Sequence, residues 1–218
     1  MDFFSIFLKG GFIMWPILLC SVIAIKIIVE RYIVINKSKA NIPAFLVKLR
    51  SFLKKRDIQG AINFCNQEKS SVSNIVKKGL KKFSLGNERV KEAIESAGKQ
   101  EIVKLEKGLS LLATISGAAP LLGFLGTVTG MIAAFRKIED LHGSTNPSDL
   151  AGGIWEALLT TAFGLIVGII ATTFYNTIVE RVNSLVLDLE VVSNDIIDIL
   201  EEMAKNKNID FDELESEN

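Results

Sequence analysis

The chain has 218 residues, with 25 basic and 25 acidic residues, so its formal net charge at neutral pH is zero. A neutral chain lacks the basic field of nucleic-acid-binding proteins, and we expect no nucleic-acid partner. Hydrophobic residues make up 49% of the sequence and the mean hydropathy is +0.34. The apolar residues gather into uncharged runs close to the roughly 20 residues that cross a bilayer. These features predict an all-α integral membrane protein.

The sequence offers no arrangement typical of an enzyme. Cys20 lies in an apolar run and Cys65 in a Lys-rich segment, and neither has a neighbour at metal-ligand spacing. The one histidine, His142, stands in a short polar loop, where a lone histidine is usually solvated. Since no nucleophile–base pair or phosphate-binding glycine motif is present either, we expect no enzymatic activity, catalytic residue, metal or cofactor.

The first apolar run covers residues 10–25 and continues past Lys26. A lysine near the end of a span extends its amine to the lipid headgroups while its stem stays in the apolar layer. Because the run ends in Glu30-Arg31 rather than at a small-residue cleavage site, it predicts a retained anchor and not a signal peptide. We therefore assign residues 1–29 to a short periplasmic N-terminus and a first transmembrane helix.

Residues 30–107 form the most basic part of the chain, with 18 basic and 8 acidic residues. Positively charged segments stay on the cytoplasmic side of a membrane, so this region is predicted to be cytoplasmic, as is the C-terminus. Apolar residues recur at helical spacing after Pro43, which suits the first turn of a helix. Another helix is predicted from Asn87 into the next apolar run without a break, because no proline interrupts it.

Two longer uncharged runs follow, at residues 108–135 and 157–179. Both exceed the length needed to cross a bilayer. The linker between them, residues 136–153, is too short for a domain and carries three acidic and two basic residues, so we place it in the periplasm. Residues 108–179 are therefore predicted to form a transmembrane hairpin of the second and third helices.

Residues 180–218 are predicted to form a cytoplasmic C-terminal helix and an acidic tail. Apolar residues repeat there at alternating spacings of three and four, which suits packing on another helix. They are Val182, Leu185, Leu189, Val192, Ile196, Ile199 and Met203. The helix that packs on them belongs either to the same subunit or to a neighbouring one. The acidic residues after Lys207 indicate a solvated tail.

Small and mildly polar residues gather on one face of each of the last two spans, taking 100° per residue. They are Ser116, Pro120, Gly123, Thr127, Gly130 and Ala134 on the second span and Ala157, Thr161, Gly164, Gly168, Thr172 and Tyr175 on the third. Bulky residues such as Leu121 and Ile166 lie opposite. Two interpretations stay open: close helix packing, which small residues permit, or a smooth lumen lined by threonine hydroxyls, in which another helix fits and turns.

Glu156 stands at the entrance of the third span, where a carboxylate is costly and marks a functional candidate. Thr160 follows one turn later on the same side. Because Glu156 lies about 100° from the centre of the small-residue face, we expect it at a subunit boundary or at the edge of a lumen, with a helix-cap role as the alternative. Neither span has an ionisable residue at its middle. If protons cross here, the titrating group must therefore come from a partner.

Two sequence blocks resemble the MotA/TolQ/ExbB proton-channel family. Residues 112–132 read LATISGAAPLLGFLGTVTGMI, and residues 153–165 read GIWEALLTTAFGL. Glu30-Arg31, directly after the first span, also looks like the family's pattern. Three spans rather than four are typical of the ExbB/TolQ branch.

The resemblance implies a homopentamer in the inner membrane of a diderm bacterium. The ring encloses two helices of an ExbD/TolR-like single-span partner, whose transmembrane aspartate carries the proton. Thr127, Thr161 and Glu156 match the family's proton-path residues, and Thr160 adjoins them. An energy transducer of the TonB or TolA kind then passes force to the outer membrane.

These observations together predict an ExbB-like subunit that uses the proton motive force to energise TonB-dependent outer-membrane transport. The alternatives are a TolQ-like subunit of the Tol-Pal envelope-integrity and division system, or a membrane scaffold that conducts no ions. The predicted face for a partner helix or for packing consists of Pro120, Gly123, Gly126, Gly130, Ala157, Gly164, Gly168 and Thr172.

Overall fold

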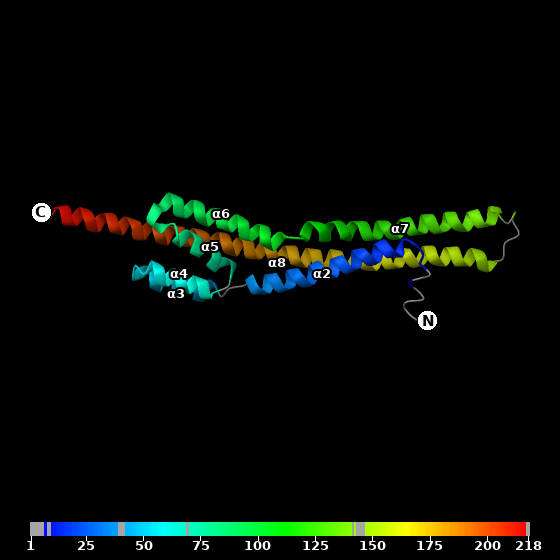
Figure 1. Cartoon of the computed structure of the whole chain (residues 1–218), viewed down its shortest axis with the longest axis horizontal. Coiled ribbons are helices and arrows are strands. Elements are labelled where there is room, and N and C mark those ends of the chain that lie inside the picture. Colours follow the sequence, from blue (N-terminus) through cyan, green and yellow to red (C-terminus); the bar gives the residue numbers. More distant parts are fainter. Residues whose placement is uncertain are drawn as a thin grey trace. The chain divides into compact units, whose positions relative to one another are not determined.

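A computed structural model describes residues 7, 10–38, 42–68, 70–140, 142 and 147–216, with side chains except at 87, 147–149, 201 and 203–216. The elements of the described residues are helical (Figure 1), which confirms the predicted all-α class for them. They are α2 (Met14–Ser38), α3 (Ile42–Lys54), α4 (Ile58–Gln67), α5 (Ser71–Leu80), the short 3₁₀ helix η1 (Phe83–Leu85), α6 (Asn87–Glu106), α7 (Leu109–Asp140) and α8 (Pro147–Ser216).

The chain divides into two compact units. The first, the hairpin unit, comprises residues 1–30 and 108–179, and the second, the helical-loop unit, comprises residues 31–107 and 180–218. Two helices, α2 and α8, each contribute their two ends to different units. The hairpin unit therefore contains the beginning of α2, all of α7 and the first part of α8.

Two helical segments of the described chain are long and apolar enough to cross a membrane. They lie in Glu88–Asp140 and Leu150–Leu200, with mean hydropathies of 1.7 and 2.0, and contain α7 and the first part of α8. The predicted first transmembrane helix, α2, is not among them. The reason is charge, because every 18-residue stretch of α2 includes Lys26, Glu30 and Arg31.

Two helix boundaries differ from the prediction. The helix that starts at Asn87 does not continue into the second span, because α6 ends at Glu106 and α7 starts at Leu109. Between them Gly108 has a φ of +82°, a left-handed conformation that ends an α-helix and that glycine adopts without strain. At its other end α7 continues to Asp140, so the predicted linker is mostly helical: loss of hydropathy marks the rim of a span, not the end of a helix.

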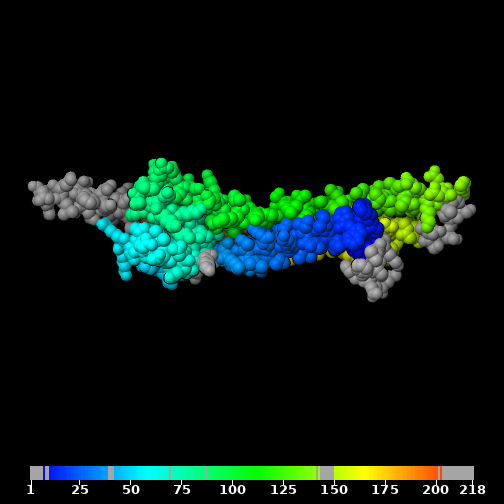
Figure 2. Space-filling view, viewed as in Figure 1, coloured from blue at the N-terminus to red at the C-terminus, as the bar shows by residue number. Residues whose placement is uncertain are grey.

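Within the hairpin unit, α2 buries one side and exposes the other. Its buried side chains are Met14, Ile17, Ala24 and Ile27, and its exposed ones include Trp15, Leu19 and Ile25. In the space-filling view of Figure 2, the blue surface of α2 borders the green surface of α7. The first unit is thus a three-helix layer with apolar side chains on its outer face.

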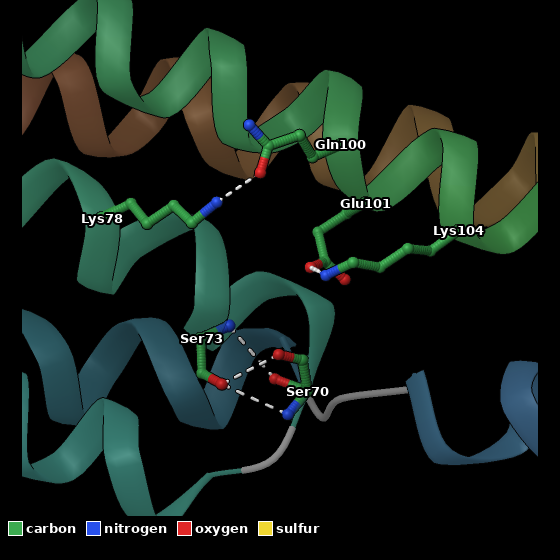
Figure 3. A network of polar contacts seen from close by, with 6 residues as sticks. All are labelled: Ser70, Ser73, Lys78, Gln100, Glu101 and Lys104. Carbon is green, nitrogen blue, oxygen red and sulfur yellow. Dashed lines mark hydrogen bonds and ion pairs between the residues drawn. The ribbon is translucent and has the colours of Figure 1, made fainter.

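In the helical-loop unit, the short helices pack through their apolar faces. The amphipathic helix predicted after Pro43 is α3, which buries Phe45, Leu49 and Leu53. Ser70 and Ser73 form a reciprocal capping box at the start of α5, since each backbone N–H is bound by the other's hydroxyl (Figure 3).

Polar side chains also link α5 to α6 and support α6 itself (Figure 3). The Lys78 amine donates to the Gln100 side-chain carbonyl at 2.5 Å, and Lys104 pairs with Glu101 at 2.7 Å. The buried Arg31 guanidinium donates to the Lys104 carbonyl at 2.7 Å, near the end of α6 where carbonyls lack helical partners. These bonds fix the end of α6 just before the break at Gly108.

The apolar repeat of the C-terminal helix is buried inside the chain itself. Val182, Leu189, Val192 and Ile196 are at most 5% exposed in the single chain. A pocket of about 270 Å³ brings Leu185 and Leu189 of α8 together with Val72 and Leu105 of the loop helices. The described side chains of this repeat therefore pack within one subunit, which is one of the two interpretations that the sequence left open. Met203 lies outside them.

Candidate functional site

The small-residue faces of α7 and α8 pack directly on each other. A Cβ on Gly164 would lie 2.6 Å from the Ala119 carbonyl oxygen and 2.8 Å from the Cα of Gly123, so the two backbones touch. Gly130 faces Ala157 in the same way. Because a side chain at these positions would separate the helices, close packing accounts for most of the predicted face. Its members in this interface are Pro120, Gly123, Gly126, Gly130, Ala157, Gly164 and Gly168.

Two predicted proton-path threonines lie in this interface. The Thr161 hydroxyl donates across it to the Gly123 carbonyl, with 2.9 Å between the oxygens. Thr160 is only 1% exposed, and its hydroxyl donates to the carbonyls of Ala157, at 2.8 Å, and Glu156, at 3.2 Å. Its side chain contacts Gly126 of α7. Both threonines thus serve the hairpin of a single chain.

The other two threonines of the predicted site, Thr127 and Thr172, lie outside this interface. The Thr127 hydroxyl donates to the Phe124 carbonyl at 2.6 Å, and the Thr172 hydroxyl donates to the Gly168 carbonyl at 2.8 Å, each within its own helix. Thr127 is half-buried and Thr172 is exposed. Their lone pairs and methyl groups are therefore available to a neighbouring helix.

Glu156 lies well inside α8, not at its start. The helix begins at Pro147, about two and a half turns before Glu156, so the Glu156 side chain lies outside the first turn. The helix-cap alternative is therefore wrong, because a charge interacts with the helix dipole only near the first turn. Instead the carboxylate contacts Gly11, in the turn before α2.

The Glu156 side chain lines a pocket of about 310 Å³ in the hairpin unit. Its walls come from the turn before α2, from α7 and from α8. They are Gly10, Phe12, Ile13, Gly126, Thr129, Gly130, Ala133, Glu156 and Thr160. Among the described residues, the walls thus combine one carboxylate-bearing residue and two threonines with apolar residues and glycines. Such a site can hold a proton or water beside the carboxylate.

Sequence reasoning missed two parts of this pocket. Thr129 lines it, while its hydroxyl donates to the Leu125 carbonyl at 3.0 Å. Gly11 touches the carboxylate from the turn before α2. The only sequence signal for Gly11 was a pair of glycines just before an apolar run.

The bulky residues of the hairpin unit point away from the small faces, as predicted. The exposed ones include Leu121, Leu125, Val128 and Ile132 on α7 and Ile166 and Ile170 on α8. Each is at least 42% exposed in the single chain. This outer face is suited to lipid or to another subunit.

The remaining candidates have ordinary roles. Among the described residues, no group of three or more histidine, cysteine or carboxylate side chains is placed to hold a metal ion. His142 is exposed in a turn. Burial raises the pKa of the Cys65 thiol to about 11, with Lys77 opposing the shift and Glu68 adding to it, so Cys65 is a thiol and not a nucleophile at neutral pH.

Comparison with known proteins places the chain in a family. Residues 67–191 match the model of the MotA/TolQ/ExbB proton channel family. An ExbB-like biopolymer transport protein of Synechocystis sp. is 32% identical over 181 residues, covering 80% of this chain and 69% of the relative.

Other relatives carry either of two names. Biopolymer transport protein ExbB of Xanthomonas campestris is 37% identical over 112 residues, which cover 51% of this chain and 44% of the relative. Tol-Pal system protein TolQ of Haemophilus influenzae is 35% identical over 115 residues, which cover 53% and 50%. The chain therefore belongs to the MotA/TolQ/ExbB proton channel family, in its ExbB/TolQ branch.

Proposed function

We propose that the chain is the ring subunit of an ExbB-type motor, in which proton flow energises TonB-dependent transport across the outer membrane. It lies in the inner membrane with its N-terminus in the periplasm and its C-terminus in the cytoplasm. Residues 1–29 and 108–179 form the membrane part, and residues 30–107 and 180–218 form the cytoplasmic part. The first span crosses despite three charges, because Lys26, Glu30 and Arg31 stand at its cytoplasmic end.

The observation that carries this proposal is the pocket around Glu156. The spans at residues 108–135 and 157–179 carry no charge, and the carboxylate of Glu156 stands directly before residue 157. Thr160 and Thr129 line the same pocket. A carboxylate costs about 2.5–3.5 kcal/mol or more at the bilayer centre and less at the boundary of a span, so a purely structural helix still has no reason to retain one here.

The titrating group at mid-membrane comes from a partner. Several copies of the chain, five by resemblance to the family, surround single-span helices of an ExbD/TolR-like protein. Thr127 and Thr172 face those helices, since their hydroxyls lie outside the hairpin interface. Each proton that crosses releases about 2.3 kcal/mol per 100 mV of membrane potential, which drives a step of one component against the other when several protons are coupled.

Substitution at the carboxylate tests the proposal. Glu156→Gln keeps size and hydrogen bonding but removes the charge, so we expect normal assembly with lost energised uptake of a TonB-dependent substrate. The complex is purified with its single-span partner and weighed by native mass spectrometry. A Glu156→Gln variant that assembles and transports normally contradicts the motor and favours a scaffold that conducts no ions.

A TolQ-like role is the second candidate, because TolQ of Haemophilus influenzae is about as similar to this chain as ExbB of Xanthomonas campestris is. Deletion of the gene separates the two roles. Loss of siderophore or vitamin uptake indicates the ExbB role, whereas detergent sensitivity and chains of undivided cells indicate the TolQ role. The partner that co-purifies, ExbD-like or TolR-like, gives an independent answer.

A further inference from the structure

The turn before α2 is shaped around the Glu156 carboxylate. A side chain at Gly11 would begin where an oxygen of this carboxylate lies. Gly11 also has a φ of +69°, which residues with a side chain rarely adopt. The backbone of this position therefore favours glycine, and a side chain here would also displace the Glu156 carboxylate, which is the flexible end of its side chain.

The same turn forms a wall of the Glu156 pocket. Gly10, Phe12 and Ile13 line it opposite Thr160 and the glycine face of α7. Without this turn, the carboxylate would be open on the side of α2. The turn before α2 is thus part of the site, and those of its residues that the structure describes contribute no ionisable group to the pocket.

We propose that Gly11 is a positioning residue for Glu156: its missing side chain lets the turn before α2 close on the carboxylate and hold it beside Thr160. This inference rests on the proposed function, in which Glu156 belongs to the proton path. The first helix then determines where the carboxylate lies, besides anchoring the chain.

A positive φ alone does not explain the contact. Gly108, also in the hairpin unit, has a φ of +82°, but a Cβ there would meet nothing closer than a methyl group of Ile27 at 3.5 Å. The backbone of Gly108 thus requires glycine for a turn and leaves room for a side chain. At Gly11, in contrast, the carboxylate of Glu156 occupies the position that a Cβ would take.

A double-mutant cycle in the full-length chain tests the contact. Gly11→Ala pushes the carboxylate away, whereas Glu156→Asp withdraws it by one methylene group. We expect Gly11→Ala to lower the thermal midpoint in detergent in the parent chain, and to lower it less when Glu156→Asp is also present, because only the contribution of the contact is then lost. Strain from the positive φ is the same in both backgrounds and cancels in the cycle. Equal losses in both backgrounds overturn the proposal.

Proton flux tests whether the contact matters for conduction. The chain is reconstituted with its co-purified single-span partner in vesicles that contain a pH-sensitive dye. We expect Gly11→Ala to reduce flux about tenfold and to move the pH of half-maximal flux, with little further effect beyond Glu156→Asp. Gly152→Ala is the matched control, since Gly152 is exposed on α8 and a Cβ there meets nothing within 4 Å.

The outcomes separate this inference from the proposed function. If Glu156→Gln abolishes flux while Gly11→Ala and Glu156→Asp act additively, the positioning role is wrong and the proton path stands. If Glu156→Gln conducts normally, the proton path through Glu156 is wrong, and the positioning role with it.

Discussion

Two threonines of the hairpin unit differ in the bonds their hydroxyls make. Thr161 donates across the interface to Gly123 of α7, whereas Thr127 donates to Phe124 of its own helix. Interhelical hydrogen bonds in membranes contribute about 0.6 kcal/mol on average. The stability of the hairpin should therefore depend on Thr161 and not on Thr127.

This difference gives a prediction that separates packing from conduction. Thr161→Val should lower the free energy of unfolding by about 0.6 kcal/mol, and Thr127→Val should leave it unchanged. In the flux assay, Thr127→Val should still reduce conduction if, as the proposed motor requires, this threonine faces the partner helix. If Thr127→Val has the thermal midpoint of the parent chain and also conducts normally, Thr127 has no role in conduction.

The buried thiol of Cys65 provides a second prediction at this scale. Its pKa is raised from 9.0 to about 11, mainly by burial. Between pH 9 and about 11, the folded state therefore keeps the thiol proton that the unfolded state loses. The contribution of the buried neutral thiol to stability is complete below pH 9 and is lost as the pH rises through about 11.

Alkylation kinetics measure this shift. In a Cys20→Ser variant, iodoacetamide should modify native Cys65 far more slowly at pH 8 than the same chain in denaturant, with the native rate still rising above pH 10. A native rate at pH 8 equal to the rate in denaturant would contradict the burial of Cys65.

At the scale of the helices, α7 and α8 depend on glycine where their backbones meet. Gly164→Ala introduces a Cβ against the Ala119 carbonyl and the Cα of Gly123, and neither can rotate away. We expect a loss of about 1–3 kcal/mol in the free energy of unfolding, measured by thermal or denaturant unfolding in detergent. Gly117→Ala is the control, because Gly117 is exposed on α7 with open space at its Cβ. A loss of similar size in both variants would argue against this packing.

Much of the helical pattern was predictable from the sequence because it depends on local periodicity. The start of α6 at Asn87 and the buried face of α3 both follow from residue spacing. The break at Gly108 was not predictable, since a glycine inside an apolar pattern is usually tolerated in a helix. Only its backbone conformation reveals that the helix ends there.

The site was predicted in part for a related reason. Glu156 was identified by its charge beside an uncharged span, a property of the sequence alone. Gly11 was missed because its role depends on a contact between a turn and a helix that are distant in sequence, and such contacts leave no periodic signal. The packing of Thr161 on Gly123 was likewise one of two interpretations that periodicity left open.

At the scale of the whole chain, charge is divided within the helical-loop unit. Residues 31–107 carry 18 basic and 7 acidic residues, and residues 180–218 carry 3 basic and 12 acidic ones. Arg50 and Lys54 line a pocket of about 610 Å³ in this unit together with Asp195 and Asp198. The neutral total thus conceals two complementary segments that attract each other at moderate salt. The basic segment also favours a cytoplasmic location for this unit.

The number of membrane crossings determines on which side each segment lies. If α2 crosses together with α7 and α8, the N-terminus is periplasmic and the helical-loop unit is cytoplasmic. In a Cys20→Ser/Cys65→Ser chain, a membrane-impermeant maleimide applied to intact spheroplasts should therefore label Asp2→Cys. It should label Ser84→Cys, which is exposed in η1, only after permeabilisation. If Asp2→Cys also requires permeabilisation, α2 does not cross, and its charged residues, Lys26, Glu30, Arg31 and Lys37, hold it on the cytoplasmic side.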